Sequence, residues 1–449
     1  MRVFGSVLLL SVCAVNLGFA DTPNPAPAPD AGNAAHAAFP ADVFNRVLPR
    51  WLRFGGEFRS RLESMDAIKY TKARDLYELT RLRINVTIQP TKWLTLFGET
   101  QDARVFFDHQ IPNLLPYQNT WDIRQAYVQL GSSKEGWVDV LAGRQNLTFG
   151  DERLIGPSDW LNMGRTFDVA RLDLHHPGYQ VSIFAASVIV GRDGVIDHHI
   201  QGNNLYGIYT SFKNAVPNAV VEPYVLWRVA PAFAGLKETV GRNHMSEVTP
   251  GVRFVGTLPD GFDYNVEMDL QTGSLGAKTI RSFAGYWSLG RTFKSVRTTP
   301  RLSIESNYAT GSKNPKGTTW NTFDQIYPSS HDKLDFADQV GRKNIEQFRI
   351  GMEEKVSRRW KLRQTYENFW LNTQNDGLYG TSGAISIAAD PASPSRHVGQ
   401  EVDLIGEYKL DNSLLGGLGY GRFFTGKFLR SASQGHDFNY PFVYVTYRF

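Results

Sequence analysis

Arginines two positions apart occur twice in the first part of the sequence, as Arg59 with Arg61 and as Arg81 with Arg83. A guanidinium group stays charged at any physiological pH and binds a carboxylate or a phosphate through two parallel hydrogen bonds. Because residues i and i+2 of a strand face the same side, each pair would present two guanidiniums together. The chemistry predicted is anion binding. Further candidates are Arg53, Arg301 and Arg363, and, with a facing that the pattern leaves open, Arg124, Arg144, Arg153, Arg165 and Arg171.

Acidic residues share the faces of the same segments, and they offer a plainer explanation for any single arginine. Opposite charges on neighbouring strands stabilise each other by about 0.2 to 1 kcal/mol, without any ligand. The arginines, however, concentrate in the first third of the chain, and the acidic residues concentrate in 262–272 and 398–409. We therefore expect a surface that is basic on one side and acidic on the other, with an anion-selective zone. The acidic candidates are Glu57, Glu63, Glu99, Asp263, Glu267, Asp269, Glu305, Glu367, Glu401 and Asp403.

Patterns typical of catalysis or metal binding are weak by comparison. The paired histidines, His175-His176 and His198-His199, lack the i, i+4 spacing of a helical zinc motif, and a metal would need further ligands. No Gly-x-Ser-x-Gly elbow occurs. We expect solvated histidines, no metal, no cofactor and no enzymatic activity.

The stretch 52–64, LRFGGEFRSRLES, shows where the first arginine pair stands. Apolar Leu52, Phe54, Phe58 and Leu62 alternate with charged residues, which is the period of a β-strand. Such a strand suits a soluble sheet with one wet face, or a membrane barrel whose outer face meets lipid and whose inner face meets water. In the second case an outward arginine would cost about 2 to 4 kcal/mol near the midplane, so the arginines would face the interior.

Eighteen strand-like runs follow each other, and the connections between them alternate in length. Eight are tight and rich in Gly, Pro, Asn, Asp or Ser, such as LPDGF at 258–262, and the nine between them are mostly longer. Outer-membrane barrels have short periplasmic turns and long external loops. The sequence therefore predicts an all-β fold, a single 18-stranded antiparallel transmembrane β-barrel over 49–449 that is wide enough for an aqueous channel. The predicted strands are 51–65, 76–89, 93–106, 121–131, 137–148, 167–175, 179–190, 204–213, 219–229, 249–258, 262–272, 279–292, 300–310, 344–355, 360–371, 398–409, 414–424 and 441–449.

The first 48 residues differ from the rest. Arg2, an apolar run and Gly18-Phe19-Ala20 predict a secretory signal peptide over 1–20, and the Pro/Ala-rich segment 21–48 predicts a flexible tether. The single cysteine, Cys13, would leave with the signal, so no disulfide is expected. No later apolar run is long enough for a transmembrane helix. The formal charge of +4 excludes a bulk attraction to nucleic acid.

The last residues, FVYVTYRF, place Val443, Val445, Tyr447 and Phe449 on one face of the final strand. This pattern resembles the C-terminal signature of bacterial outer-membrane proteins, whose terminal aromatic residue is recognised by the barrel-assembly machinery. Phe449 is the predicted contact.

Several segments resemble the alginate-export family of outer-membrane proteins: RQAYVQL at 124–130, GRQNLTFGDERLIGPSDWLNMGRTFDVARLDL at 143–174, PRLSIESNYATGS at 300–312 and FDQIYPSSHDKLDFADQVGRKNI at 323–345. Members of that family are monomeric 18-stranded barrels with an arginine-rich constriction and a neighbouring acidic residue, through which a uronate polymer passes. The resemblance implies passage of an acidic polysaccharide by a monomer in the bacterial outer membrane, surrounded by outer-membrane lipid, with periplasmic secretion components as candidate partners and without nucleic acid. Its most family-like stretch holds Arg144, Asp151, Arg153, Arg165, Asp168 and Arg171.

Three functions remain open at this point. The first is an anionic-polysaccharide channel lined by Arg59, Arg61, Arg81, Arg83, Arg124, Arg363 and the residues of the family-like stretch. The second is a general or anion-selective diffusion porin. The third is an outer-membrane hydrolase. Two long loops, 310–344 and 372–397, are long enough to fold into the mouth as a gate.

Overall fold

The computed structural model describes residues 40–110, 116–132, 136–213, 215–231 and 244–449, which belong to one unit, Ala37–Phe449. The predicted signal peptide and the first part of the predicted tether lie outside these residues. The last part of the segment expected to be a flexible tether differs from expectation, because Pro40–Asn45 form helix α1. Phe44 of α1 packs edge-on against Phe54, with ring centroids 5.9 Å apart.

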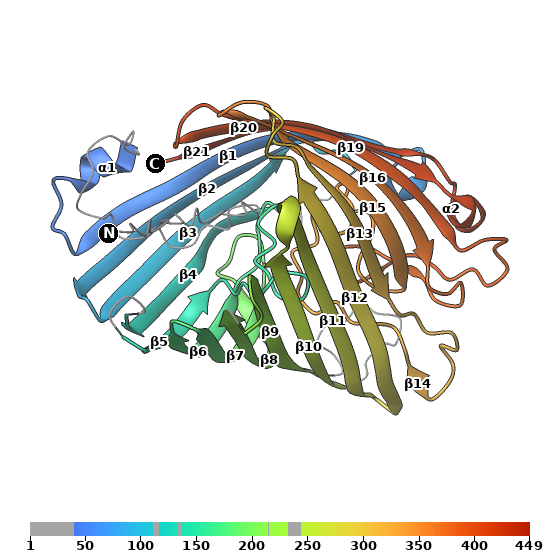
Figure 1. Ribbon diagram of the computed structural model, residues 1–449, viewed down its shortest axis with the longest axis horizontal. Helices are drawn as coiled ribbons and strands as arrows, with labels where there is room; N and C mark the ends of the chain where they lie inside the picture. The colour runs from blue at the N-terminus through green and yellow to red at the C-terminus, as the bar shows by residue number, and fades with distance from the viewer. Residues whose placement is uncertain (1–39, 111–115, 133–135, 214, 232–243) are drawn as a thin grey trace, which may run out of the picture. The chain divides into compact units, whose positions relative to one another are not determined.

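Among the described residues, eighteen long strands pair in chain order, each antiparallel to the next. The last strand pairs with the first, with Phe58 opposite Tyr447 and Arg61 opposite Tyr444, so the sheet closes into a barrel (Figure 1). The long strands are β1 Leu52–Asp66, β2 Arg74–Thr91, β3 Leu94–Phe106, β4 Asn119–Gly131, β5 Val138–Gln145, β6 Phe167–His176, β7 Tyr179–Val190, β8 His198–Lys213, β9 Ala219–Ala230, β10 Met245–Thr257, β11 Phe262–Leu275, β12 Lys278–Thr292, β13 Arg301–Ala309, β15 Ile345–Lys355, β16 Trp360–Leu371, β19 His397–Lys409, β20 Leu414–Thr425 and β21 Phe438–Arg448. The short elements are η1 Ile68–Tyr70, η2 Pro259–Gly261, β14 Thr319–Trp320, β17 Leu378–Tyr379, β18 Ile385–Ile387 and helix α2 Lys427–Ala432.

The predicted fold class is confirmed, and each predicted strand corresponds to one of these long strands. The largest differences are at β8 and β10, which begin at His198 and Met245, before the predicted 204 and 249. Both extensions lie at the end with the longer connections. Beyond the hydrocarbon layer a strand does not need an apolar face, so its sequence does not need to alternate.

The two faces of the wall separate as the period-two pattern predicts. On β1, Phe58 is 42% exposed whereas its neighbour Arg59 is 6% exposed. Strand β21 repeats this pattern, with exposed Val443 and Val445 alternating with buried Phe442 and Tyr444. Exposed apolar residues therefore form the lipid-facing exterior, and polar or charged residues face inward. No helix in the described part of the chain is long and apolar enough to cross a membrane.

The eight short connections lie at one end of the barrel, where α1 and the C-terminus also lie (Figure 1). We assign this end to the periplasm because outer-membrane barrels have their short turns there. The seam closes here: the N–H of Gly56 donates to the carbonyl oxygen of Phe449 over 2.8 Å. A side chain at Gly56 would meet the ring of Phe449 at 2.5 Å, so the close approach requires glycine.

Two connections from the opposite end, 146–166 and 310–344, run inside the barrel and pair with each other. The N–H of Gly156 donates to Tyr327 over 2.9 Å, the N–H of Tyr327 to Leu154 over 2.8 Å, and the N–H of Ser329 to Glu152 over 3.0 Å. We call these segments the inner loops. They supply much of the buried apolar core, with Leu154, Ile155, Phe323, Leu334 and Ala337.

Candidate functional site

Five arginines from β1, β2 and β4 converge on one short piece of the first inner loop, residues 159–161. Arg59 donates to the carbonyl oxygens of Asp159 and Trp160, each over 3.0 Å. Arg61 donates to the carbonyl oxygen of Trp160 over 2.6 Å, and Arg81 to that of Asp159 over 2.8 Å. We call the five residues the arginine wall: Arg59, Arg61, Arg81, Arg83 and Arg124.

The Asp159 carboxylate lies in the centre of this wall. It accepts from Arg83 over 2.6 Å and from Arg81 over 3.2 Å, and Arg124 lies 3.7 Å away. Burial would raise the pKa of Asp159, but the charges of Arg81, Arg83 and Arg124 outweigh burial and hold this pKa well below its ordinary value. Asp159 is therefore ionised, as a bound uronate carboxylate would be.

The strand register explains why the wall needs these acidic neighbours. Arg59 and Arg81 are directly opposite each other on β1 and β2, an arrangement that is destabilising for like charges. Glu57 compensates Arg81 over 2.6 Å, and Glu99 compensates Arg124 over 3.0 Å. The arginine side chains are nearly fully buried, whereas Asp159 keeps 26% of its side chain exposed, more than Glu57 with 14% or Glu99 with 9%.

Trp160 ties the two inner loops and the wall together. Its ring stacks on His331 of the second inner loop with centroids 4.1 Å apart, and the guanidinium of Arg61 lies 3.9 Å over it. Phe442 of β21 meets it edge-on at 5.3 Å. His331 in turn contacts Asp338, with its Nδ1 2.9 Å from the carboxylate. The position of Asp159 on the wall is thus coupled to the second loop.

The structure places Asp151, Arg153 and Arg165 inside the barrel, but in contacts that hold the inner loops. Arg153 pairs with Asp151 over 2.9 Å and lies 3.3 Å over the ring of Tyr286. Burial opposes ionisation of Asp151, but Lys333 and Arg153 lower its pKa below the ordinary value. Arg165 donates to Pro328 over 2.8 Å, and its burial lowers its pKa to about 10.

The expectation that Arg144 and Asp168 line the pore needs correction. They are directly opposite each other on β5 and β6, and each lies two residues from an exposed residue of the same face, Ala142 and Ala170. Alternation therefore puts both on the outward side of the wall, where they form an ion pair of 3.0 Å that His199 joins at 2.9 Å.

The two remaining candidates face inward but lie away from the arginine wall. Arg171 pairs with Asp173 over 2.8 Å on its own strand, and Arg363 pairs with Asp332 of the second inner loop. The structure thus brings five of the twelve predicted site residues together on the segment 159–161.

An acidic group, which includes residues of the predicted acidic segment 398–409, lies beside the arginine wall, on strands that only β20 and β21 separate from β1. Glu367, Glu401 and Asp403 of β16 and β19 are buried, and Asp335 of the second inner loop adds a fourth carboxyl group. Burial, together with the neighbouring charges of Asp338 and Asp403, raises the pKa of Asp335 well above its ordinary value. Within the described ranges, no group of three or more His, Cys, Asp or Glu residues is arranged to hold a metal ion.

Sequence reasoning did not single out Asp159 and Trp160, and it identified His331 only as one of the charged residues of the loop 310–344. All three lie within the segments that carry the family resemblance. One signal could have identified Asp159 and Trp160. The sequence Ser-Asp-Trp lies between two glycine-containing turns, in a connection that is longer than most loops between strands.

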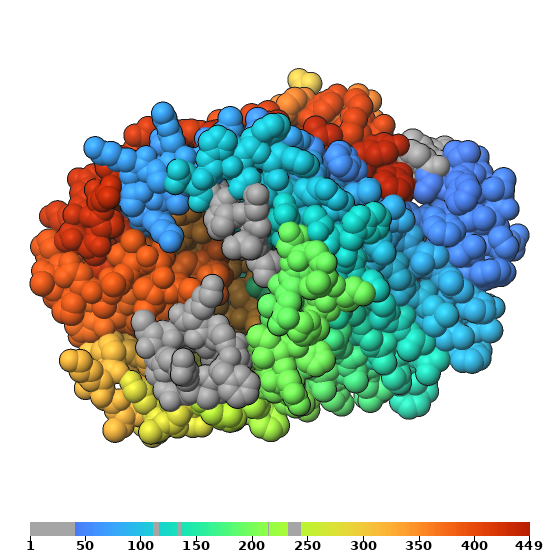
Figure 2. All heavy atoms as spheres, turned by 180° about the vertical axis from the view of Figure 1, so that it is seen from behind, coloured from blue at the N-terminus to red at the C-terminus, as the bar shows by residue number. Residues whose placement is uncertain are grey.

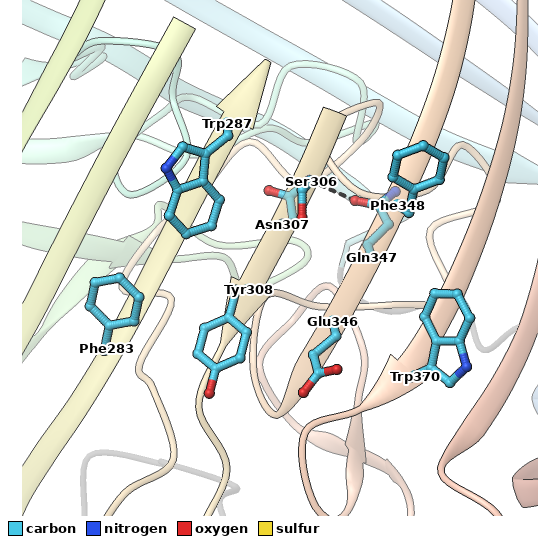
Figure 3. Close-up of a pocket in the computed structure, with 9 residues that line it drawn as sticks. All are labelled: Phe283, Trp287, Ser306, Asn307, Tyr308, Glu346, Gln347, Phe348 and Trp370. Carbon is cyan, nitrogen blue, oxygen red and sulfur yellow. Dashed lines mark hydrogen bonds between the residues drawn. The ribbon is translucent and has the colours of Figure 1, made fainter. Parts of the chain in front are cut away.

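A groove in the wall lies outside this site. It has a volume of about 660 Å³ and is lined by residues from β12, β13, β15 and β16, whose aromatic side chains project from the wall in one direction (Figure 3). Trp287 and Phe348 in it are 37% and 41% exposed, so the groove belongs to the lipid-facing exterior. Figure 2 shows a separate hollow in the surface, between the green and the orange parts of the chain.

Comparison with known proteins agrees with this architecture. The family model described as Alginate export matches residues 50–443. The chain belongs to the alginate export family. No curated protein matches its sequence.

Solved structures that resemble this alginate export family member are outer-membrane proteins of Pseudomonas aeruginosa. OpdK, solved with vanillate, is 10% identical, with a TM-score of 0.61 over 89% of this chain and 98% of OpdK. OccD3 (OpdP) is 12% identical, with a TM-score of 0.55 over 88% of this chain and 91% of OccD3. OpdL is 11% identical, with a TM-score of 0.57 over 89% and 98%. The family and the fold together identify the chain as a bacterial outer-membrane channel.

Proposed function

We propose that the channel passes an anionic polysaccharide, of alginate-like uronate type, and that the arginine wall is its carboxylate-binding surface. The observation that carries this proposal is the contact of Arg81, Arg83 and Arg124 with the single carboxylate of Asp159. A uronate sugar carries the same group, and charge-assisted hydrogen bonds from guanidinium to carboxylate are the strong ones. The family membership supports the same substrate class.

In this view Asp159 occupies the position of a substrate carboxylate, and the bore is closed. Opening requires the segment 159–161 to leave the wall. A polymer can drive this movement because each uronate sugar brings a carboxylate that replaces the carboxylate of Asp159. Such an exchange keeps the guanidiniums paired throughout, which avoids leaving buried charges uncompensated.

A diffusion porin for small organic anions is the second candidate. It is favoured by the structural likeness to OpdK, whose solved structure holds vanillate. A porin of that kind would bind one small anion at the wall, whereas a polymer channel would bind several carboxylates of one chain. An outer-membrane hydrolase has no comparable support.

Planar-bilayer recordings with uronate oligomers as blockers test the proposal. We expect saturable block that strengthens with oligomer length, whereas neutral dextran of the same size blocks weakly. Changing Arg81 and Arg83 to Gln should weaken the block by about tenfold or more for each arginine, because a hydrogen bond to a charged group contributes about 1.5 to 3 kcal/mol. The matched control is Arg144→Gln, which removes an outward arginine. Equal block by short and long oligomers would favour the diffusion porin, and equal block by dextran would reject anion recognition.

We further propose that the protein acts as a monomer and that the barrel-assembly machinery recognises its terminal aromatic residue. The ring of Phe449 lies 6.0 Å from that of Tyr447 at the periplasmic seam, which supports a packed and accessible C-terminal signal. Assembly yield of Phe449→Ser in outer-membrane fractions tests this recognition, and a yield equal to that of the unchanged chain would reject it.

A further inference from the structure

Two neighbouring periplasmic segments, 293–300 between β12 and β13 and 355–361 between β15 and β16, carry six basic residues and no acidic residue. All six side chains are exposed. The segments adjoin each other, because the N–H of Lys355 donates to the carbonyl oxygen of Thr298 over 3.0 Å. We call these residues the basic rim: Lys294, Arg297, Lys355, Arg358, Arg359 and Lys361.

The cations of the basic rim are not paired with carboxylates of the described residues, in contrast to most cations of the arginine wall. The adjoining strands hold the ion pairs Arg301–Asp263 and Arg363–Asp332, but no rim residue takes part in an ion pair within the described ranges. Lys355 and Lys361 are directly opposite each other on β15 and β16, where like charges are destabilising. On its other side Lys361 is opposite Glu407 of β19, and Arg359 donates to the hydroxyl of Tyr408, but neither contact is an ion pair. Exposed cations without an ion-pair partner among the described residues suit an anionic partner from outside the chain.

Basic charge is most concentrated in this sector of the periplasmic end, although single basic residues such as Arg46, Arg50 and Lys213 occur elsewhere at that end. The described turns 91–94, 176–179 and 257–262 each hold one charged residue at most. Lys355 shares the inward face of β15 with Arg349, and Lys361 shares that of β16 with Arg363. The rim therefore reaches from the periplasmic surface to the inner face of the wall, where Glu353 lies between Lys355 and Arg349.

We propose that the basic rim is a docking surface on which an anionic polysaccharide chain is captured before it enters the bore, an inference that rests on the proposed function. The two turns are two strand spacings apart, about 10 Å, so the rim spans more than one sugar of a chain and is too long for one small anion. Exposed, hydrated lysines and arginines attract such a chain from a distance without holding it at one register. Weak and reversible binding suits a surface from which the polysaccharide chain must move on into the bore.

The competing occupant is the anionic headgroup surface of the inner leaflet. Exposed Val296 and Val356 would suit it, but the inward facing of Lys355 and Lys361 favours the polymer.

The test compares block from the two sides in bilayers of neutral lipid, with the channel in known orientation. The variant changes Lys355, Arg358, Arg359 and Lys361 to Gln, and uronate oligomers are added to one side at a time. We expect the association rate from the periplasmic side to fall about tenfold or more, and the rate from the other side to stay unchanged. At high salt the unchanged chain and the rim variant should both associate slowly with the oligomer, so the difference between their association rates should disappear. The matched control changes Arg46, Arg50 and Lys213, exposed basic residues at the same end but outside the rim, to Gln, and it should behave as the unchanged chain.

Three results would overturn the docking surface: an unchanged periplasmic rate, an equal fall from both sides, or an effect that appears only in anionic lipid, which would assign the rim to the membrane surface. These results differ from failure of the proposed function itself. If the unchanged chain is blocked by uronate oligomers no better than by neutral dextran from either side, the substrate class is rejected. If that block is present and depends on Arg81 and Arg83 but not on the rim, only the docking surface is rejected.

Discussion

The arginine wall and the basic rim hold similar numbers of cations but differ in the burial and the pairing of these cations. In the wall every guanidinium is nearly fully buried and faces a carboxylate or a carbonyl oxygen of the chain. In the rim the side chains are exposed, and two lysines stand opposite each other. Burial makes the difference, because a charge removed from water must be compensated, whereas a hydrated charge can stay unpaired at little loss of stability.

This difference gives the two regions different functions in one channel. A compensated cluster can exchange its internal carboxylate for an external one, so it controls opening and selectivity. An uncompensated surface raises the local concentration of anions and thereby affects the rate of arrival. Substitutions in the wall should therefore change stability and gating, and substitutions in the rim should change association rates.

The largest effect is expected for Asp159→Asn. Removing one partner of a buried ion cluster costs about 3 to 5 kcal/mol, because the remaining charges stay uncompensated. We expect the segment 159–161 to leave the wall, which raises single-channel conductance and the preference for anions over cations. The matched control is Asp168→Asn, an outward carboxylate paired with Arg144. Conductance equal to that of the unchanged chain would show that Asp159 does not close the bore.

The pH dependence of the second inner loop should follow Asp335. Its pKa is raised above the ordinary 3.8, so its contribution to stability is present below 3.8 and is lost as the pH rises through the raised value. The carboxylate of Asp335 also accepts the N–H groups of Gln339 and Val340 over 2.5 and 3.1 Å, contacts that Asn can retain. We therefore expect protease cleavage of the loop to increase with pH, and Asp335→Asn to remove this dependence. Asp159 should show no transition above pH 3.8, since its pKa is lowered.

The fold could be predicted from the sequence because the membrane imposes one local rule along the whole chain. Each spanning residue faces either lipid or water, so Phe58 and Arg59 reveal their faces without knowledge of any distant residue. The exceptions lie where that rule ends, as at the extended start of β8, or where the chain leaves the hydrocarbon, as at α1.

The site could be predicted only in part, because strand alternation is a local rule that says nothing about contacts with distant segments. The facing of Arg59, Arg61, Arg81 and Arg83 follows from strand alternation, but the segment that they bind comes from a loop about 80 to 100 positions away. No periodicity connects such positions. Arg144 and Asp168 show the opposite error, since their place in the family-like stretch suggested the bore although their strand parity points outward.

A smaller effect is expected for Trp160→Ala, which uncouples the wall from the second loop. The substitution removes the stacking on His331 and the cation–π contact with Arg61, each of about 0.5 to 2 kcal/mol. We expect frequent brief openings, and a small loss of thermal stability of the barrel because Trp160 also contacts Arg61 of β1 and Phe442 of β21. Trp287→Ala on the lipid-facing exterior serves as the control and should leave gating unchanged. A steady closed level in the Trp160 variant would show that Asp159 alone holds the segment.

The smallest effect, and the one that separates the two regions most directly, is expected for Lys361→Gln. Lys361 is opposite Lys355 on one side and Glu407 on the other, so the substitution removes one repulsion and one attraction and should change the free energy of unfolding by less than about 0.5 kcal/mol. Arg81→Gln should lower it, because Glu57 and Asp159 then lose a buried partner. Urea unfolding in the same detergent measures both values. A loss of stability for Lys361→Gln as large as that for Arg81→Gln would mean that the rim is compensated in the folded state, and the contrast between exchange at the wall and capture at the rim would no longer hold.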